Sequence, residues 1–276
     1  MNSTNFSALP KRLVTSLVLI SLSAFVLFRM SAYYFGALVV LFVAAALFEF
    51  FTLLRETKMP SFRLFGVVMG VVVSMSVVLE SGAIQSGDIL FLVLGCLFLF
   101  IIQFFRHNNS EALVGISLTL FGILYVSWFL SFVIRIRFIP NGIFWVAFLL
   151  AVTKSADIGA YFVGTLFGRH PLIPHISPKK SVEGTLGGVV LSVVTALALK
   201  SYIPVAMSTA HVAAIGFLIG IVGQVGDLSE SLMKRSCNAK DSSSLLPGMG
   251  GVLDAVDSIL FTAPIFYLHL KIFLQL

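Results

Sequence analysis

Long apolar runs recur along almost the whole chain and limit what it can fold into more than any other feature. Nine runs approach the ~20 residues that a helix needs to cross a bilayer. They cover residues 13–28, 32–54, 64–79, 89–105, 112–134, 139–153, 184–199, 203–226 and 252–270. Hydrophobic residues make up 58% of the 276 and charged residues only 11%, which is too little charge to coat a soluble core. This excludes a soluble enzyme, a disordered chain and a nucleic-acid-binding module. It predicts an all-α integral membrane protein with about nine transmembrane helices.

The distribution of Lys and Arg among the loops predicts how these spans are oriented. With nine spans and the N-terminus inside, thirteen of the 18 basic residues lie in inner segments and five in outer ones. Because basic residues favour the cytoplasmic side, we expect the N-terminus inside and the C-terminus outside. Arg135 and Arg137 fit this topology least well, since both fall on the outer side. The first run follows Lys11 and Arg12 as in a signal peptide, but no clear cleavage site follows, and we interpret it as a retained span.

Polar chemistry is concentrated in the second half of the chain. Residues 1–150 are apolar spans joined by short loops, and we expect them to form a lipid-facing scaffold. Residues 151–276 add two longer polar segments, 154–183 and 227–251, and we expect this region to be catalytic within one integral domain. Both segments face inside in the predicted topology, so the active site is expected at the cytoplasmic face of the C-terminal half.

The end of the eighth apolar run carries a polar face. Five polar residues follow one another at helical spacing and span about 100° of one face. They are Gln224, Asp227, Ser231, Lys234 and Arg235. An ionisable residue at a membrane boundary is a functional candidate by default, which applies above all to Asp227. The alternative is an interfacial cap, with Lys234 and Arg235 as topology anchors.

A glycine-rich loop leads into the last apolar run. Residues 246–257 read LPGMGGVLDAVD. Glycines let the backbone approach a ligand, and the N-terminus of the helix that follows favours phosphate. Asp254 and Asp257 are three residues apart, so they share a helical face and repel each other unless a cation lies between them. Such hard oxygen ligands suit Mg²⁺, whereas the alternative is N-terminal capping by acidic side chains.

Two further segments place charged residues beside glycines. In the first, Asp157 and Tyr161 are neighbours on one helical face and two glycines follow. Those glycines also suit close helix packing, which does not explain Asp157. The second, ISPKKSVEG at residues 176–184, places a basic pair before a glycine-rich helix start and suits phosphate binding. Its alternative is positive-inside charge with a capping box from Ser181.

Acidic candidate metal ligands, basic residues and glycine-rich turns therefore gather at one predicted membrane face. This combination suits phosphoryl or nucleotidyl transfer to a lipid-borne acceptor. Apart from these segments, Glu49 is a lone carboxylate inside the second apolar run. It either pairs inside the helix bundle or lines a polar cavity, and the sequence leaves both readings open.

The second half of the chain resembles the phosphatidate cytidylyltransferases, also called CDP-diacylglycerol synthases. From Ser231 to Asp257 the pattern SxxKRx4KD…LPGxGGxxDxxD resembles the signature of that family. The upstream segments DxGAYFVG and ISPKKSVEG resemble two further motifs of it, so the likeness covers roughly residues 155–260. The chain departs from the usual signature at Met249, where the family has His, and at Ala255, where it has Arg.

The resemblance implies a reaction in which CTP and phosphatidate give CDP-diacylglycerol and pyrophosphate, with Mg²⁺ held by Asp227 and Asp254. A second metal ion stays open. The implied catalytic residues are Asp227, Ser231, Lys234, Arg235, Lys240, Asp241, Asp254 and Asp257. The implied substrate-binding residues are Asp157, Tyr161, Ser177, Lys179, Lys180, Glu183, Gly184, Gly248, Gly250 and Gly251.

The expected partners are therefore CTP, phosphatidate and the lipid bilayer, with no nucleic acid and with a homodimer left open. The expected location is the bacterial inner membrane, which the chain crosses several times. One alternative is a CTP-dependent kinase for a polyprenol-type lipid, which would need a base for a neutral hydroxyl. Another is a transporter for an anionic solute, which would place charge near the bilayer midplane in matched broken helices. A third, motivated by Met249 and Ala255, is a catalytically inactive scaffold.

Overall fold

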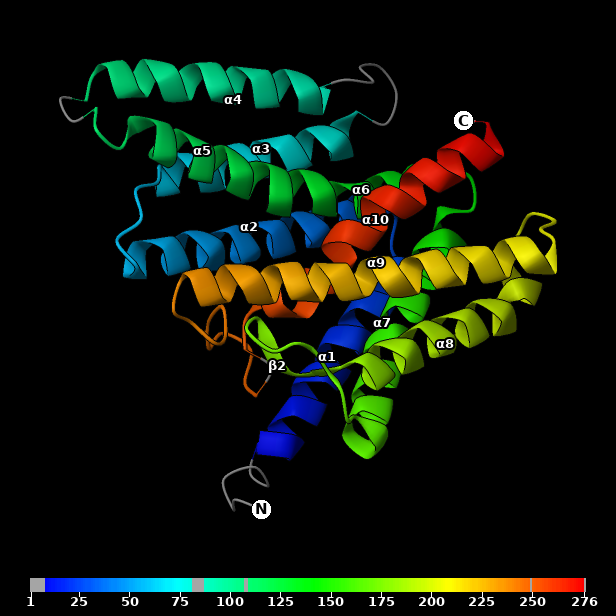
Figure 1. Cartoon of the computed structure of the whole chain (residues 1–276). Coiled ribbons are helices and arrows are strands. Elements are labelled where there is room, and N and C mark those ends of the chain that lie inside the picture. The colour runs from blue at the N-terminus through cyan, green and yellow to red at the C-terminus, as the bar shows by residue number, and fades with distance from the viewer. Residues whose placement is uncertain (1–7, 81–86, 107–108, 249, 276) are drawn as a thin grey trace. The chain divides into compact units, whose positions relative to one another are not determined.

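The computed structural model describes residues 8–80, 87–106, 109–248 and 250–275, which are helical apart from one short hairpin and the connecting loops. The chain divides into two compact units. One comprises Met1–Phe138 and Cys237–Ala255, and the other comprises Ile139–Ser236 and Val256–Leu276. Each unit has its own set of packed helices (Figure 1).

The first unit is built around α2. Its helices are α1 (Ala8–Arg29), α2 (Ala32–Glu56), α3 (Arg63–Leu79), α4 (Gly87–Phe104) and a continuous segment made of α5 (Ala112–Gly122), the π-helical turn η2 (Ile123–Trp128) and α6 (Phe129–Phe138). Val43 and Phe51 of α2 are fully buried where α2 packs against α3, η2 and α6. The Ser74 hydroxyl hydrogen-bonds the hydroxyls of both Ser127 and Ser131, at 2.9 and 3.1 Å. These bonds satisfy polar groups that would otherwise be stranded in an apolar bundle.

The second unit packs its helices closely through glycines. It contains α7 (Gly142–Phe167), the strands β1 (Pro171–Ile173) and β2 (Ser177–Ser181), α8 (Val182–Ala198), the 3₁₀ turn η3 (Lys200–Tyr202), α9 (Thr209–Ser236) and α10 (Val252–Leu274), whose first turn belongs to the first unit. A Cβ atom at Gly159 would lie 2.7 Å from the Gly187 carbonyl oxygen, and one at Gly188 would lie 2.7 Å from that of Ala156. Because a backbone carbonyl in a helix cannot easily move, only glycine allows α7 and α8 to approach this closely.

The nine predicted helical segments are all present in the described part of the chain, but two of them end ten or more residues beyond the apolar runs. Helix α7 was expected to end at Thr153 and ends at Phe167, and α9 was expected to end at Gly226 and ends at Ser236. Residues 154–167, expected in a polar segment, are therefore helical. The reason is that α7 keeps one buried face after its apolar run, at Ala156 and Gly159.

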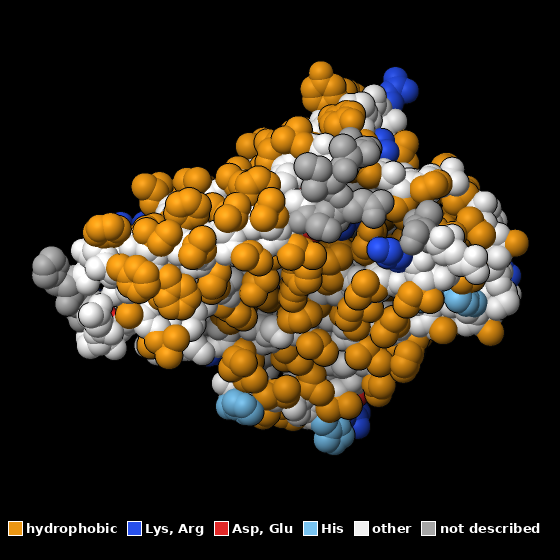
Figure 2. All heavy atoms as spheres, turned by 90° about the horizontal axis from the view of Figure 1, so that it is seen from above, with side chains coloured by type: hydrophobic (Ala, Val, Ile, Leu, Met, Phe, Trp, Pro, Cys, Tyr) orange, Lys and Arg blue, Asp and Glu red, His pale blue; other side chains and the backbone are white. Residues whose placement is uncertain are grey.

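Among the residues that the structure describes, six helices are long and apolar enough to cross a membrane. They are α2, α4, the segment Ala112–Phe138, α7, α9 and α10. Three shorter apolar helices, Val14–Arg29, Arg63–Leu79 and Val182–Ala198, accompany them. Large hydrophobic side chains are exposed along many of these helices, and Figure 2 shows them covering most of one face. Surface this apolar is suited to lipid rather than water. The helical fold with several membrane-spanning helices is thus confirmed, and the orientation in the membrane stays a prediction.

Candidate active site

Three predicted acidic residues come together around one lysine in the second unit. The Nζ atom of Lys154, in α7, lies 3.0 Å from Asp157 Oδ2 and 3.2 Å from Ser258 Oγ in α10. The Ser258 hydroxyl in turn donates to Asp157 Oδ2 at 3.0 Å. Asp227 of α9 and Asp257 of α10 also interact electrostatically with the Lys154 ammonium. Carboxylates from three helices therefore lie within the electrostatic reach of this lysine.

Close helix packing brings these carboxylates together. A Cβ atom at Gly226 would lie 2.7 Å from the backbone oxygen of Asp257, so α9 contacts α10 directly at this point. Asp227 is the next residue along α9. The side chains of Asp157 and Asp227 are 31% and 35% exposed, whereas Asp257 as a whole is only 9% exposed. The cluster therefore offers two carboxylates that a ligand can reach and one that is buried.

The β-hairpin places a basic residue against this cluster. Lys180 of β2 forms an ion pair with Asp227, with 2.8 Å between Nζ and Oδ2. Lys179, beside it on the same strand, is exposed. Arg235 of α9 donates from Nε to the Ile176 carbonyl oxygen at 3.3 Å, which ties the start of the strand to the helix. Three of the predicted cationic residues thus lie on or contact one short hairpin.

Other residues predicted for the site make contacts within the protein. Ser181 caps α8, because its hydroxyl accepts a hydrogen bond from the Gly184 backbone N–H at 3.1 Å. Glu183 Oε2 accepts the backbone N–H groups of Arg169 and His170 at 3.1 and 3.2 Å. These contacts match the capping alternative raised for this segment, and a role for Glu183 and Gly184 in substrate binding stays a prediction.

Four more predicted residues lie close in sequence to Asp157, Lys180 or Asp227. Tyr161 is 70% exposed and follows Asp157 by one helical turn. Ser231 is partly exposed one turn after Asp227. Lys234, one turn further along α9, forms an ion pair with Glu230. Ser177, the first residue of β2, pairs with Ile173 in the hairpin.

In the first unit, the glycine-rich signature loop (residues 240–251) folds onto the side chain of Asp254. Asp254 Oδ2 accepts hydrogen bonds from the Gly251 N–H at 2.7 Å, the Ser242 N–H at 3.0 Å and the Ser242 hydroxyl at 2.7 Å. Leu246 and Gly250 exchange backbone hydrogen bonds of 2.8 and 3.1 Å, which closes the loop into a tight turn. Asp254 therefore caps the start of α10, as the capping alternative predicted, while a metal-binding role stays a prediction.

Two glycines allow this turn. Gly248 and Gly250 have φ angles of 79° and 98°, a conformation that other residues adopt only with strain. Lys240 and Asp241 are exposed at the start of the loop, and a Cβ atom at Gly250 would lie 3.6 Å from that of Asp241. Met249, one of the two departures from the family signature, lies outside the described residues.

The oxygen donors in both units suit a hard cation. Asp227 belongs to the second unit and Asp254 to the first. Within the described ranges, no three His, Cys, Asp or Glu side chains surround a common point at which they could hold a metal ion. The reachable donors are carboxylate oxygens, which are the ligands that Mg²⁺ prefers, particularly where substrate phosphates supply the rest. The residues present therefore fit Mg²⁺, but the protein side chains alone do not complete its coordination.

Sequence reasoning missed three residues that the structure brings to these groups. Lys154 is one of the thirteen basic residues counted for the inner side, and its position three residues before Asp157 could have suggested a helical ion pair. Ser258 and Ser242 carried no signal, because their partners become neighbours only in the fold. Each of these serines hydrogen-bonds a predicted acidic residue.

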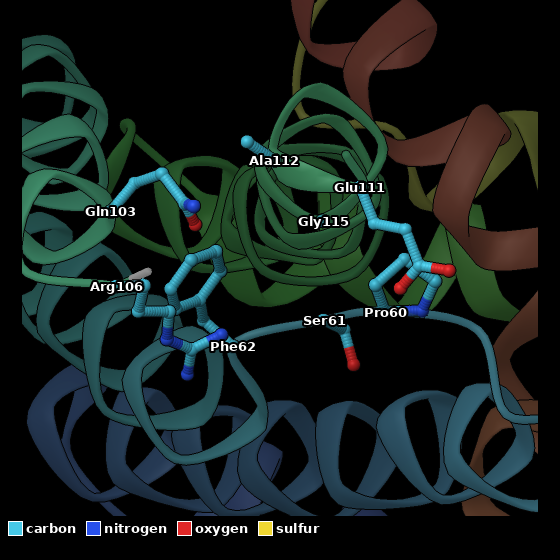
Figure 3. Close-up of a pocket in the computed structure, with 8 residues that line it drawn as sticks. All are labelled: Pro60, Ser61, Phe62, Gln103, Arg106, Glu111, Ala112 and Gly115. Carbon is cyan, nitrogen blue, oxygen red and sulfur yellow. The ribbon is translucent and has the colours of Figure 1, made fainter. Parts of the chain in front are cut away.

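A small pocket in the first unit lies apart from these residues (Figure 3). It is lined by Pro60, Ser61, Phe62, Gln103, Arg106, Glu111, Ala112 and Gly115. The Arg106 guanidinium lies over the Phe62 ring, 4.2 Å from its centroid. The pocket contains none of the predicted site residues, so it is not the candidate active site.

The second unit holds carboxylates and lysines and the first holds a glycine-rich turn, all of them groups suited to phosphate-bearing substrates, in a helical membrane protein. This chain belongs to the cytidylyltransferase family, which it matches over residues 10–273. The resemblance noted in the motifs is thereby confirmed.

Its relatives cover most of its length. A phosphatidate cytidylyltransferase of Brucella suis is 36% identical over 84% of this chain and 83% of its own length. A phosphatidate cytidylyltransferase of Synechocystis is 31% identical over 93% of this chain and 94% of its own. The uncharacterized protein YnbB of Escherichia coli is 38% identical over 60% of this chain and 55% of its own.

Proposed function

We propose that this protein is a phosphatidate cytidylyltransferase, which converts CTP and phosphatidate into CDP-diacylglycerol and pyrophosphate at the cytoplasmic face of a bacterial inner membrane. The observation that carries the proposal is the carboxylate cluster of Asp157, Asp227 and Asp257 beside a basic hairpin, in a chain of the cytidylyltransferase family. Acidic groups that attract a metal and lysines that attract phosphates are what a reaction between two polyanions requires.

In the proposed reaction, a phosphate oxygen of phosphatidate attacks the α-phosphorus of CTP in line. A new P–O bond forms, and the bond from the α-phosphorus to the oxygen that bridges it to the β-phosphorus breaks, so that pyrophosphate leaves. The attacking phosphate is already an anion, so no side chain has to act as a general base and no covalent enzyme intermediate is needed. The protein's contribution is to position the two substrates and to offset their charge.

The basic residues of the second unit would offset this charge. Lys179 is exposed on β2, and Lys180 is held near Asp227 by their ion pair. Binding of CTP would let Lys180 exchange the Asp227 carboxylate for a phosphate oxygen, which frees that carboxylate for the metal. Asp227 and Asp254 would hold Mg²⁺, which would neutralise the phosphates and the leaving pyrophosphate. A second metal ion and a homodimer are not needed for this scheme.

The test uses the full-length protein in detergent with dioleoyl phosphatidate, Mg²⁺ and CTP labelled at either the α- or the γ-phosphate. Cytidylyl transfer places the α-label in the lipid and releases the γ-label in pyrophosphate, and EDTA should stop both. Asp227→Asn and Asp254→Asn should each lower turnover at least ~100-fold, as expected for losing a metal ligand, with unchanged elution on gel filtration. Glu56→Gln, at the exposed end of α2, is the matched control.

The labels also separate the alternatives. A γ-label that appears in a polyprenol would indicate the lipid kinase instead. Protein that fails to bind CTP at all would favour the transporter or the inactive scaffold. Near-normal turnover in both Asp variants would remove these residues from the proposed metal site.

A further inference from the structure

Glu49 of α2 is a buried carboxylate that the reaction described above does not use. It is only 2% exposed, yet it accepts four hydrogen bonds within the first unit. Oε1 accepts the Ser243 hydroxyl at 2.6 Å and the Val252 N–H at 2.9 Å. Oε2 accepts the Leu253 N–H at 2.8 Å and the Ser242 hydroxyl at 3.2 Å. The donors lie 193 to 204 residues further along the chain, in the signature loop and the first turn of α10.

We infer that Glu49 is a positioning residue for the active site: its carboxylate holds the signature loop and the start of α10 in the arrangement that surrounds Asp254. The inference rests on the proposed function, which gives Asp254 its role in holding Mg²⁺. It assigns part of the active site to a helix of the N-terminal half. The sequence alone offered that half no role beyond a scaffold.

The charge of Glu49 suits this task. The first N–H groups of a helix have no partner inside the helix and carry partial positive charge, so a carboxylate beside them is stabilising. Val252 and Leu253 begin α10, and Glu49 receives both of their N–H groups. Hydrogen bonds to a charged acceptor are roughly twice as strong as neutral ones, and more so away from water.

Ser242 links Glu49 directly to Asp254. Its hydroxyl lies 2.7 Å from Asp254 Oδ2 and 3.2 Å from Glu49 Oε2, so its single proton is shared between the two carboxylates, with Asp254 the nearer acceptor. A side chain at Gly251 would collide with both the Ser242 hydroxyl and the Glu49 carboxylate, so this part of the loop is tightly packed. A second anchor comes from α1, where the Thr15 hydroxyl donates to the Pro247 carbonyl oxygen at 3.0 Å. Loss of the Glu49 charge should therefore loosen the loop and displace Asp254.

The experiment compares four variants of the full-length protein in detergent. Glu49→Gln keeps the size of the side chain, but it replaces one acceptor oxygen with a donor that faces hydroxyl and N–H donors. Glu49→Asp keeps the charge with a shorter reach. Ser243→Ala removes a single donor and leaves the carboxylate in place. Glu56→Gln, two turns further along α2 and exposed, is the matched control for the loss of a negative charge.

Two measurements are made on each variant. Hydrogen–deuterium exchange reports on peptides that cover residues 241–254 and on peptides elsewhere. Steady-state kinetics report kcat and the KM for CTP at several Mg²⁺ concentrations. We expect Glu49→Gln to speed exchange in residues 241–254 at least ~10-fold with little change elsewhere, and to lower kcat/KM about 30- to 100-fold, the loss expected for one or two charged hydrogen bonds. The Mg²⁺ requirement should rise, because Asp254 is misplaced.

The other variants should show smaller effects than Glu49→Gln. Ser243→Ala should change both measurements in the same direction by a smaller factor, Glu49→Asp should recover part of the loss, and Glu56→Gln should match the wild type. Unchanged exchange and kinetics in Glu49→Gln would overturn the inference. Faster exchange over the whole protein would also overturn it, because Glu49 would then be a general stability residue.

The exchange measurement keeps this inference separate from the proposed function. If the wild type makes no CDP-lipid, the proposed function fails, yet local exchange in residues 241–254 still shows whether Glu49 holds the loop. If Glu49→Gln does not fold, the single-donor variant Ser243→Ala gives the decision by the same two measurements.

Discussion

At the scale of single residues, Lys154 offsets part of the negative charge of the candidate site. Three carboxylates in one region of a membrane protein repel one another and are costly to desolvate. The Lys154 ammonium, bonded to Asp157 and Ser258, supplies a compensating charge before any metal or substrate binds. The acidic cluster can therefore fold and persist in the absence of Mg²⁺.

This role predicts that Lys154→Met makes the protein's stability depend on Mg²⁺. Breaking a fully buried ion pair costs about 3–5 kcal/mol, but the Lys154 side chain is 42% exposed, so we expect a loss of about 1–2 kcal/mol in EDTA. Mg²⁺ should recover part of the loss, because a cation that binds the folded state stabilises it. Thermal unfolding in detergent with EDTA and with Mg²⁺ measures both effects. Lys154→Arg should stay close to the wild type, as should Lys271→Met at the exposed end of α10. Equal losses with and without Mg²⁺ would contradict the prediction.

The site residues that could be predicted from the sequence have informative neighbours in the chain, whereas those that were missed have partners that are distant in sequence. Asp157, Asp227 and Asp257 stand in short motifs beside glycines, so their importance could be predicted from neighbours in the chain. The partnership of Lys154 with Ser258 joins residues 104 apart. The four bonds to Glu49 span even greater separations, so both depend on how the helices pack. The sequence left open whether Glu49 pairs in the bundle or lines a cavity, and its burial and four donors favour pairing.

At the scale of elements, the close contact of α7 with α8 depends on glycines whose hydrogen atoms face backbone. A Cβ atom at Gly188 would lie 2.7 Å from the Ala156 carbonyl oxygen, which cannot give way. At Gly223 of α9, the nearest atoms would be 3.6 to 3.8 Å away, which is ordinary van der Waals contact. Both glycines lie inside helices of the same unit, so an alanine at either site gains the same helix propensity.

We therefore predict opposite effects for two chemically identical substitutions. Gly188→Ala should destabilise the protein by about 1–3 kcal/mol, because overpacking forces α8 away from α7 next to Asp157. Gly223→Ala should be neutral or stabilise it by about 0.4–1 kcal/mol, because alanine lowers the entropy of the unfolded chain. Thermal unfolding of the two variants in detergent measures the difference. Similar midpoints for both would mean that α7 and α8 do not approach as closely as the structure shows.

The elements themselves were predictable to the extent that apolar runs determine them. Each of the nine runs corresponds to a helical segment in the described part of the chain, because a helix is the way for an apolar segment to satisfy its backbone in lipid. The ends of α7 and α9 were missed because both helices continue into polar sequence. There the helix is supported by contacts of small residues with neighbouring helices, and hydropathy does not record those contacts.

At the scale of the whole molecule, the two compact units do not follow the order of the chain. The signature loop, late in the sequence, belongs to the same unit as α1 and α2. The N-terminal helices thus do more than face lipid, since two of them hydrogen-bond the loop. Orientation in the membrane is a separate property of the whole chain, and it rests on the distribution of basic residues.

Arg135, which fits the predicted orientation least well, has its charge offset in the structure. Its Nη2 atom lies 2.7 Å from Asp88 Oδ2 and 3.7 Å from Glu80 Oε2. The indole N–H of Trp128 also donates to Asp88 Oδ2 at 2.8 Å. An arginine paired with carboxylates in this way can lie on the outer side at lower cost than a bare one. The topology, with the N-terminus inside and the C-terminus outside, stays a prediction, because orientation follows the distribution of Lys and Arg rather than net charge.

Cysteine labelling of intact cells tests this topology. Cys96→Ala and Cys237→Ser first give a background without thiols, although burial raises the pKa of the Cys237 thiol and makes it slow to react. Single cysteines are then placed at exposed positions, as Glu56→Cys for the inner side and as Ser201→Cys and Gln275→Cys for the outer side. A membrane-impermeant maleimide should label the two outer positions in intact cells, and Glu56→Cys only after the membrane is permeabilised. The reverse pattern would place the signature loop and the basic hairpin outside, away from cytoplasmic CTP. All three positions could also be labelled in intact cells without permeabilisation. The chain would then cross the membrane fewer times than its nine apolar runs predict.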